Sequence, residues 1–496
     1  MNSLGKKTLV ASAVSAALAS SAAFAVAPTT TPVNVFYAGG GSAQANAFFV
    51  AACKLFGSNM DVYSDNGATL SSDYYVMYGN DAGNKLGLGA GANIMYIYKF
   101  NGGSFTNGIA PQKSSAPTQL SYPPVGTSTT AGTILGTAAL VGTQGTACTT
   151  GLPTYSYTAA ASVNASPDFG LADVEVPVFQ HFNNPTGNAG GSAKNTDGGA
   201  APAVGLADAI YDNLFGVAVT ANVYASTAHP KTSFARSEME GILSGTISDW
   251  SELYDDNGAQ MPAGGITFLD RGEGSGTKAS GNEYFLGYPG DGASAQLAFS
   301  MGNAYCGTSL TACGLVEQSQ DVAEGSTNAV IADLKLAQAN SVRAIAVLGL
   351  ENPPVKNQVG GVNQYDFAKI DGVAVDTGAT GDNINGTVAT SYINVVKGNY
   401  DFFFQNSFNT RGAALVGQPL ANANAFKAQM QLPTFVGANC NCGFPAGLSG
   451  TLQDADKAGA LAKGVTTNSR NEVSTGPLQP FFLAVSGGIP VSSDPL

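Results

Sequence analysis

Residues 268–285, FLDRGEGSGTKASGNEYF, contain the side chains in this sequence that are best suited to chemistry. A strand-like run ends just before Arg271, and Ser275, Gly276 and Thr277 then begin a pattern that predicts a helix. A helix N-terminus has unpaired backbone N–H groups and roughly half a positive charge. An arginine adds a fork of N–H donors that matches a tetrahedral oxyanion. The stretch therefore predicts an oxyanion-binding site.

A second glycine turn has a similar design. In VNVFYAGGGSAQANAFFVAACKLF, residues 33–56, alternating apolar residues indicate a strand, and apolar residues at helical spacing follow the turn. Ser42 stands at the junction, where it is expected to be the N-cap and to offer a hydroxyl donor. In α/β sheets, ligands bind where strands end and helices begin. The turn is neither a dinucleotide fingerprint nor a P-loop, because the later glycine and the lysine are missing.

Strand-like and helix-like segments alternate along the rest of the chain. Residues 235–253 indicate a helix, a turn and a short helix, residues 327–339 a helix, and residues 341–350 a buried strand. This alternation predicts an α/β protein with mostly parallel sheets. Residues from about 100 to 160 are rich in Thr, Gly, Ser and Pro, so we expect an insertion or long loop with hairpin character there.

The composition argues against several classes of function. The chain has 496 residues, of which 44% are hydrophobic and only 11% charged, and its net charge is −13. Nucleic-acid binding needs clustered Lys and Arg, and the sequence has no such cluster. The only two histidines, His181 and His229, leave little room for a metal site or a Ser-His-Asp triad. We therefore expect a protein that is not an enzyme and needs no metal or other cofactor.

The N-terminus is typical of a secretory signal. Two lysines precede the apolar run TLVASAVSAALASSAAF, and the tripeptide that ends at Ala25 fits a small-residue cleavage site. A membrane anchor is the alternative interpretation, but the run is short, rich in Ala and Ser and only weakly hydrophobic. We therefore expect residues 1–25 to be a cleaved signal peptide and the mature protein to be periplasmic or secreted.

The cysteines of an exported chain are expected to form structural disulfides. There are six of them: Cys53, Cys148, Cys306, Cys313, Cys440 and Cys442. Cys306 and Cys313 are close enough to close one loop. The last two are separated by one residue and would pair with each other only under strain, so one of them is expected to reach one of the first two.

Two motifs lie in the middle of the chain. Residues 241–253, GILSGTISDWSEL, carry the pattern I-x-x-G-x-I-x-x-W, and residues 266–286 carry a strand followed by R-x-x-G-S-G-T. Together they resemble the phosphate-binding protein of bacterial ABC phosphate importers. Further stretches are similar to the family in the same order: VNVFYAGGGSAQANAF, DFGLADVEVP, and AKIDGVAV with TSYINVVKGNYDFF. The resemblance covers the skeleton of the chain, and the remainder would be insertion.

The resemblance implies the type II periplasmic-binding-protein fold, in which two α/β lobes are joined by two crossover strands and close on a ligand. Residues 28–180 would form the first part of lobe 1, with the insertion at about 100–160 inside it. Residues 181–390 would form lobe 2, and residues 391–496 would return to lobe 1 and end in a C-terminal segment.

The resemblance also implies a set of donors for phosphate. Arg271 would clamp two phosphate oxygens, and hydroxyls and backbone amides would supply the remaining donors. These donors are Ser42, the amide of Ala43, Ser275, Gly276 and Thr277. Recognition would then rest on local dipoles and one arginine, so the acidic net charge is no objection.

Two acidic residues would complete the site. Asp173 matches the buried aspartate of the family, and a carboxylate can only accept hydrogen bonds. It therefore favours an oxyanion that still carries a proton, such as hydrogen phosphate, over fully ionised sulfate. Glu273 matches an acidic position of the family motif, where it would add a second acceptor or pair with Arg271. The alternative for Glu273 is a solvated loop acid.

The sequence departs from the family pattern at several positions. Ala172 stands where the family usually has Ser, and Ala43 replaces an aromatic residue. The next serine-bearing turn of the family has no clean counterpart, and residues 77–84, MYGNDAGN, are the best candidate. In that turn Asn80 could donate a hydrogen bond, but Asp81 would oppose a bound anion if it pointed inward.

These features favour an exported solute-binding protein that captures inorganic phosphate or a similar oxyanion. It would be a monomer that serves ABC permease subunits or scavenges phosphate outside the cell, with no nucleic-acid partner. The second hypothesis is a secreted or surface structural or adhesion protein with altered or lost anion binding. The long neutral Thr/Gly/Asn segments motivate it. A phosphate-ester hydrolase on the same scaffold is a third hypothesis.

Overall fold

The computed structural model of the protein describes most of the chain from residue 30 to residue 431. The described residues are 28, 30–56, 60–64, 73–81, 83–125, 134–138, 152–157, 162–180, 183–185, 200–287, 305–350, 352, 354–374, 394, 399–431, 482–483 and 491–492. Within these ranges no helix is both long and apolar enough to cross a membrane. The expected signal peptide lies outside them.

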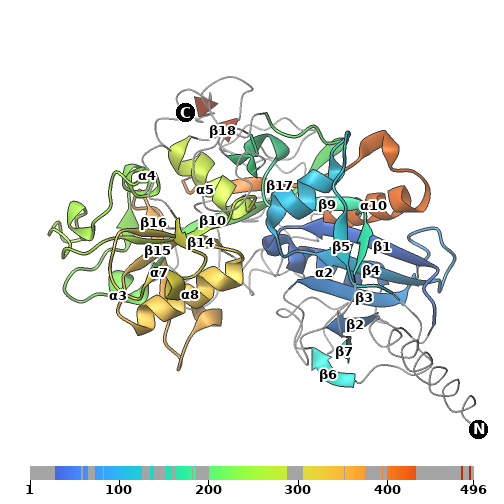
Figure 1. Cartoon of the computed structure of the whole chain (residues 1–496), viewed down its shortest axis with the longest axis horizontal. Coiled ribbons are helices and arrows are strands. Elements are labelled where there is room, and N and C mark those ends of the chain that lie inside the picture. The colour runs from blue at the N-terminus through green and yellow to red at the C-terminus, as the bar shows by residue number, and fades with distance from the viewer. Residues whose placement is uncertain are drawn as a thin grey trace, which may run out of the picture.

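One 15-stranded sheet runs through the molecule, and its two halves carry the two lobes (Figure 1). The first lobe has the strand order β9-β1-β4-β3-β2-β7-β6, and the second has the order β13-β14-β12-β15. The strands of the first lobe are β1 (Asn34–Gly40), β2 (Met60–Ser64), β3 (Tyr74–Asn80), β4 (Asn93–Lys99), β6 (Ile134–Ala138), β7 (Leu152–Ser156) and β9 (Phe169–Ala172). Those of the second are β11 (Ser233–Phe234), β12 (Thr267–Arg271), β13 (Tyr305–Gly307), β14 (Gln320–Glu324), β15 (Ala344–Gly349) and β16 (Tyr365–Ile370).

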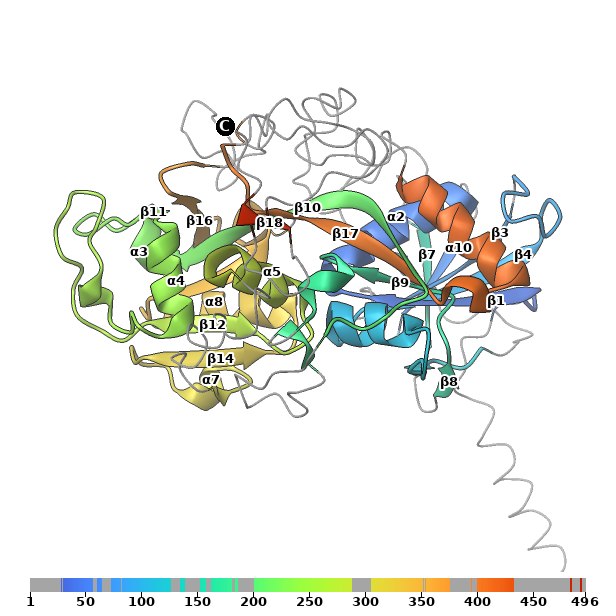
Figure 2. The same cartoon turned by 90° about the horizontal axis from the view of Figure 1, so that it is seen from above.

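Two long strands, β10 (Leu206–Thr220) and β17 (Phe403–Thr410), connect the lobes. They pair antiparallel with each other, and Figure 2 shows them running side by side from one lobe to the other. The first part of β10 pairs with β17, whereas its last part, from Phe215, pairs with β15 and β16. Strand β17 also pairs with β9 in the first lobe. The connection between the lobes is therefore a continuous piece of sheet.

Helices cover the sheet in both lobes. The longer ones are α2 (Ala45–Phe56), α4 (Arg236–Ser244), α5 (Gly276–Leu286), α8 (Thr327–Ala339) and α10 (Gly417–Met430). The short ones are α3 (Ala221–Tyr224), α7 (Leu310–Cys313), η1 (Ser42–Gln44), η2 (Ser104–Ile109), η3 (Ala110–Gln112), η4 (Val176–Val178), η7 (Trp250–Glu252), η8 (Pro354–Asn357) and η9 (Gly412–Ala414). Two short strand pairs stand apart from the main sheet: β5 (Leu120–Tyr122) with β8 (Val163–Ala165), and β18 (Phe482–Leu483) with β19 (Val491–Ser492).

Aromatic rings form the core under α2 and α10 of the first lobe. Phe48 of α2 stacks on Phe426 of α10 with ring centroids 5.0 Å apart, and on Tyr98 of β4 at 4.4 Å. Phe426 also packs against Phe169 of β9. Buried rings of this size contribute much of the packing energy of a domain. They hold the carboxyl end of β1, which leads into Ser42, at a fixed place on the sheet.

The predicted α/β class with two lobes and two crossover strands is confirmed. Parallel pairs lie at the centre of each lobe: β1 with β4 and β9, and β12 with β14 and β15. Antiparallel pairs involve the connecting strands and the outer strands of the first lobe. The expected hairpin character is found for β6 and β7, which pair antiparallel. The expected long loop is wrong for residues 104–112, because η2 and η3 are largely buried and η2 packs against β1 and β9.

One predicted disulfide is confirmed: Cys306 of β13 is bonded to Cys313 of α7. Cys53 of α2 is disulfide-bonded as well. The other three cysteines, Cys148, Cys440 and Cys442, lie outside the described residues, so the pairing expected for them stays a prediction.

Candidate functional site

The candidate site lies where the carboxyl ends of strands from both lobes meet helix N-termini. Strands β12 and β14 are parallel neighbours, and Arg271 is paired in register with Glu324. The loop after β12 leads into α5, and the loop after β14 leads into α8, which begins at Thr327. Strand β1 of the first lobe leads into η1 and α2 at Ser42. The carboxyl ends of parallel strands lie at one edge of a sheet, so these starts converge.

Arg271 and two hydroxyl groups form a bridge between the lobes. Arg271 is buried, with 4% of the residue exposed, and its Nη1 donates to Thr327 Oγ1 at 2.6 Å. Thr327 Oγ1 also lies 3.2 Å from Ser42 Oγ, where either hydroxyl can donate. The structure thus brings Ser42 and Arg271 to the same threonine, although they are far apart in the sequence.

Ser42 takes a different backbone position from the one expected. Gly41, not Ser42, precedes the helix as N-cap, and Ser42 is the first residue of the 3₁₀ turn. The N-cap prediction for Ser42 is therefore wrong, and its hydroxyl points to Thr327 instead. Ala43 follows it and is buried.

The start of α5 matches the prediction. Ser275 is the N-cap, and its hydroxyl accepts a hydrogen bond from the backbone N–H of Lys278 at 3.4 Å. Gly276 and Thr277 are the first helical residues, and both are buried. Gly274 before them has a φ of 82°, a conformation that favours glycine, and its carbonyl accepts the N–H of Phe105 at 2.9 Å. This backbone hydrogen bond joins the second lobe to the first.

Asp173 follows β9 and packs against the start of α5. Its carboxyl accepts from Gln44 Nε2 at 3.2 Å, and its backbone N–H donates to Ser104 Oγ at 3.3 Å. Tyr211 of β10 donates to Gln44 Oε1 at 2.5 Å, which turns the amide N–H groups of Gln44 toward Asp173. A Cβ on Gly276 would lie 2.6 Å from the Asp173 Cβ, so only glycine allows this approach.

Opposing effects act on the pKa of the Asp173 carboxyl group. Burial raises its pKa, while hydrogen bonds from Ser104 and Gln44 and the positive charge of Arg271 lower it. A carboxyl in this state can accept a hydrogen bond from a protonated ligand.

Glu273 takes a partner that the sequence did not indicate. Its side chain is 8% exposed and pairs with Lys278 at 3.3 Å rather than with Arg271. Tyr305 donates to the same carboxylate at 3.3 Å, and Lys278 also pairs with Asp270 at 2.5 Å. Glu273 is therefore part of a buried ionic cluster and not a solvated loop acid.

Glu324 lies next to Arg271 without cancelling its charge. Burial raises the pKa of Glu324 to about 9, and its hydrogen bond with Asp333 and the negative charge of that residue raise it too, while Arg271 lowers it. At neutral pH Glu324 is accordingly protonated and uncharged. An uncharged Glu324 does not compensate the positive charge of the Arg271 guanidinium.

The candidate turn at residues 77–84 lies at the wrong end of the sheet. Asn80 pairs with Asn93, which begins β4, and β4 runs parallel to β1. This turn therefore lies at the end of β1 opposite Ser42. The carboxylate of Asp81 accepts the backbone N–H groups of Lys85 at 2.7 Å and Leu86 at 2.9 Å, so it stabilises its own turn.

The site residues that the sequence analysis missed are Gln44, Ser104 and Thr327. Ser104 follows β4 in the run Asn-Gly-Gly-Ser, which is a glycine turn of the same kind as the one before Ser42. Thr327 follows the N-cap Ser326 at the start of a correctly predicted helix. Both signals were present in the sequence as a strand, a turn and a hydroxyl residue at a helix start.

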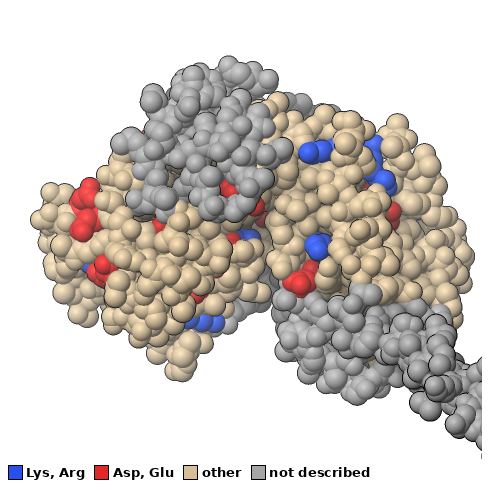
Figure 3. Space-filling model, in the orientation of Figure 1, with Lys and Arg blue, Asp and Glu red and all other residues tan. Residues whose placement is uncertain are grey.

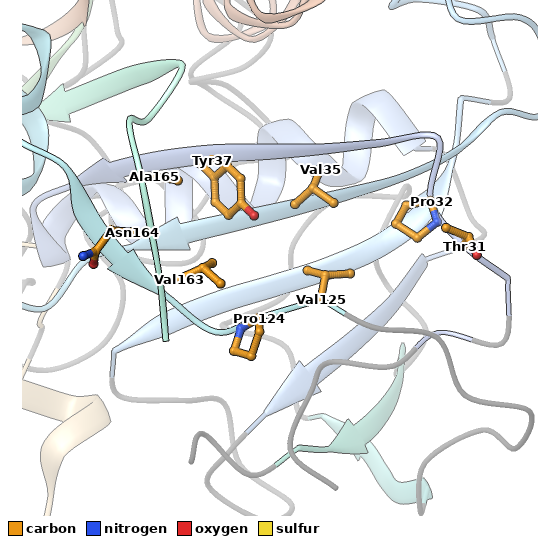
Figure 4. A pocket seen from close by; sticks show the side chains of 9 residues that line it. All are labelled: Thr31, Pro32, Val35, Tyr37, Pro124, Val125, Val163, Asn164 and Ala165. Carbon is orange, nitrogen blue, oxygen red and sulfur yellow. The ribbon is translucent and has the colours of Figure 1, made fainter. Parts of the chain in front are cut away.

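Neither the face of the molecule in Figure 3 nor the pocket in Figure 4 gathers positive charge among the described residues. Lys and Arg are scattered over the face in Figure 3, with no cluster of them over any one element. The pocket in Figure 4 lies between β1 and the β5–β8 pair and has a volume of about 550 Å³. Its lining is uncharged and mostly apolar: Thr31, Pro32, Val35, Tyr37, Pro124, Val125, Val163, Asn164 and Ala165.

No protein-family model matches the chain, and no curated protein matches its sequence. Several solved structures are similar to part of this chain. The chain is 18% identical to the phosphate-binding protein from Stenotrophomonas maltophilia, with a TM-score of 0.29 over 54% of this chain and 71% of that one. It is 16% identical to PstS from Borrelia burgdorferi, with a TM-score of 0.26 over 47% of this chain and 68% of that one. It is 14% identical to an ABC-type phosphate transport receptor from Vibrio cholerae, with a TM-score of 0.24 over 45% of this chain and 66% of that one. Likenesses at this level do not define the ligand or the role of the chain.

Proposed function

We propose that this protein is a binding protein that captures inorganic phosphate or a similar oxyanion between its two lobes. The observation that carries the proposal is the position of Arg271. This buried residue lies a few residues before the start of α5. Its guanidinium donates a hydrogen bond to Thr327, the first residue of α8, and Thr327 in turn is hydrogen-bonded to Ser42 of the other lobe. Helix N-termini and an arginine fork are the groups that proteins use to hold phosphate.

In this proposal each residue has a distinct role. Arg271 binds two oxygens, replacing its contact with Thr327, while Ser275, Gly276 and Thr277 donate from the start of α5. Ser42 and the amide of Ala43 donate from the first lobe. Asp173 accepts a hydrogen bond from the protonated oxygen that hydrogen phosphate carries and sulfate lacks. Glu273 acts indirectly, because its pairing with Lys278 fixes the loop between Arg271 and α5.

The proposal includes a biological role outside the cytoplasm. The mature chain would be a periplasmic or secreted monomer that serves an ABC phosphate importer or scavenges phosphate. Lobe 1 would comprise residues 28–180 and the return from 391, and lobe 2 residues 181–390. If the oxyanion site does not bind, the alternative is a secreted or surface structural or adhesion protein on the same fold.

The test is calorimetric titration of the ligand-stripped protein with phosphate, sulfate and arsenate at pH 7. We expect one-to-one phosphate binding with a Kd near about 1 µM, equivalent to about 8 kcal/mol, and much weaker binding of sulfate. Arg271→Lys keeps the charge but removes the fork, and it is expected to weaken phosphate binding about 100-fold, or about 2.7 kcal/mol.

The matched control is Arg343→Lys. Arg343 directly precedes β15, whose first residue pairs with the first residue of β12, so it lies at the opposite end of the sheet from Arg271. It pairs with Glu317 at 2.6 Å, and its replacement should leave the Kd unchanged. A folded wild-type protein that shows neither heat nor thermal stabilisation with any of the three anions would overturn the proposal.

A further inference from the structure

Two glutamates whose carboxyl groups are buried lie on packed elements from different lobes, beside the candidate site. Glu175 directly precedes η4 of the first lobe, and Glu283 lies on α5 of the second. All four of their carboxyl oxygens are shielded from solvent, and none has a hydrogen-bond partner. Buried polar atoms are nearly always paired, so an unpaired pair of carboxyls calls for a specific explanation.

The helix face that carries Glu283 is also the face that holds the lobes together. Gly276, Ala279 and Glu283 are spaced by three and four residues and therefore share one side of α5. Gly276 packs against Asp173, and the carbonyl of Ala279 accepts from Asn183 Nδ2 at 3.4 Å. The segment after β9 thus lies along this face and brings Glu175 close enough to Glu283 for its charge to act on that residue.

Neither glutamate has a positive partner among the described residues. Burial raises the pKa of Glu175 to about 8, and the backbone N–H groups of Glu175 itself and of Gln405, which lie near the carboxyl but outside hydrogen-bond geometry, lower it by less. Burial raises the pKa of Glu283 well above its ordinary value, and the negative charge of Glu175 raises it further. Gln405 of β17 is uncharged, and its Nε2 is itself buried without a partner.

The cations on the adjoining elements are held by other acids. Lys278, on α5 itself, pairs with Asp270 and Glu273. Arg236 of α4, which packs against α5, pairs with Asp401 at 2.5 Å. Among the residues that the structure describes, the charge that acts on Glu283 is that of Glu175.

We propose that Glu175 and Glu283 form a proton-operated latch, which holds α5 against the first lobe while its carboxyls are protonated and releases it when both ionise. A protonated carboxyl can donate to its neighbour, whereas two carboxylates in a dry contact repel and lose their hydration. Opening the contact returns them to water. Protons suit this place better than a divalent cation, because calcium takes about six to eight oxygen ligands. No described cluster of three or more acidic, His or Cys side chains is suited to a metal.

The experiment compares the full-length mature protein with Glu283→Gln, which mimics the protonated side chain. Infrared difference spectroscopy of wild type minus variant at pH 7 is expected to show the carbonyl band of a protonated carboxylic acid. The wild-type Tm is expected to fall by at least about 5 °C from pH 6 to pH 9 relative to that of Glu283→Gln. Small-angle scattering is expected to show a larger radius of gyration at pH 9 for wild type only.

The matched control is Glu240→Gln, an exposed glutamate on α4, which should retain both the infrared band and the pH dependence of the wild type. If Glu283→Gln does not fold, Glu175→Gln provides the same comparison from the other side of the contact. Absence of the band at pH 7, or parallel pH profiles for wild type and variant, would overturn the latch. Stabilisation by calcium at pH 9 that Glu283→Gln abolishes would overturn the assignment to protons. These readouts need no oxyanion, so they are independent of the phosphate proposal.

Discussion

A single hydroxyl group, that of Thr327, joins three parts of the candidate site. It accepts from Arg271 at 2.6 Å and lies 3.2 Å from Ser42 in the other lobe. Thr327→Val keeps the shape and removes the acceptor, so it leaves a donor of a buried cation without this partner. We expect a loss of about 1–3 kcal/mol in the free energy of unfolding. Urea denaturation measures it, and Thr327→Ser, which keeps the hydroxyl, should lose less than half as much. Equal losses in both variants would show that the methyl group, not the hydrogen bond, matters.

At this scale the sequence predicts residues that are neighbours in the chain and misses those that meet through the fold. Arg271 and Ser275 lie in one strand–turn–helix unit, so local spacing was enough to connect them. Thr327 and Ser104 come from other units, and they reach the site because of the order of strands in the sheet. Spacing carries no information on that order. The partner of Glu273 was missed for the same reason, since Lys278 turns back toward it only once α5 is formed.

At the scale of an element, α5 contains one glycine that cannot be replaced by a larger residue and one that can. A Cβ on Gly276 would lie 2.6 Å from the Asp173 Cβ and 2.8 Å from its Oδ2. At Gly281 of the same helix the nearest atom, of Val347, would be at 3.4 Å. Alanine favours a helix over glycine by about 1 kcal/mol. We therefore expect Gly281→Ala to stabilise the protein by up to about 1 kcal/mol, whereas Gly276→Ala forces α5 away from the first lobe.

Thermal unfolding and small-angle scattering of the two glycine variants measure this difference. Gly276→Ala should have a lower Tm than the wild type and a larger radius of gyration, while Gly281→Ala should keep the wild-type radius. If both variants are equally compact and equally stable, the start of α5 does not hold the lobes together as described.

The elements themselves were largely predictable, because their signals are local. The helix at 327–339 was predicted with the bounds of α8, and residues 235–253 do form α4 and η7. Periodicity and N-cap residues determine such segments. The pairing partners of β10 were not predictable, because this strand changes from β17 to β15 and β16 within its own length. That change depends on how the lobes are placed, which no short stretch encodes.

At the scale of the whole molecule, several buried carboxyl groups make stability depend on pH. Burial raises the pKa of Asp168 to about 7, of Glu175 to about 8 and of Glu324 to about 9, against ordinary values of 3.8 and 4.5. The folded state therefore binds these protons more tightly than the unfolded state does. Their contribution to stability is fully present below the ordinary values and is lost as the pH rises through 7 to 9. Asp249 acts in the opposite sense, since hydrogen bonds from Ser251 lower its pKa and its contribution is lost only in acid.

The free energy of unfolding is therefore expected to be largest near pH 5 and to be several kcal/mol lower at pH 9, since one pKa unit corresponds to about 1.4 kcal/mol. Urea denaturation at pH 3, 5, 7 and 9 measures it. The net charge of −13 also opposes compaction as the pH rises, but this repulsion acts between exposed charges that salt screens. Repeating the series in 0.5 M NaCl, roughly a Debye length of 4 Å, separates the two causes, because buried carboxyls are screened much less. A decline between pH 5 and 9 that salt abolishes would assign the effect to net charge, and a maximum near pH 9 would contradict the role of the buried acids altogether.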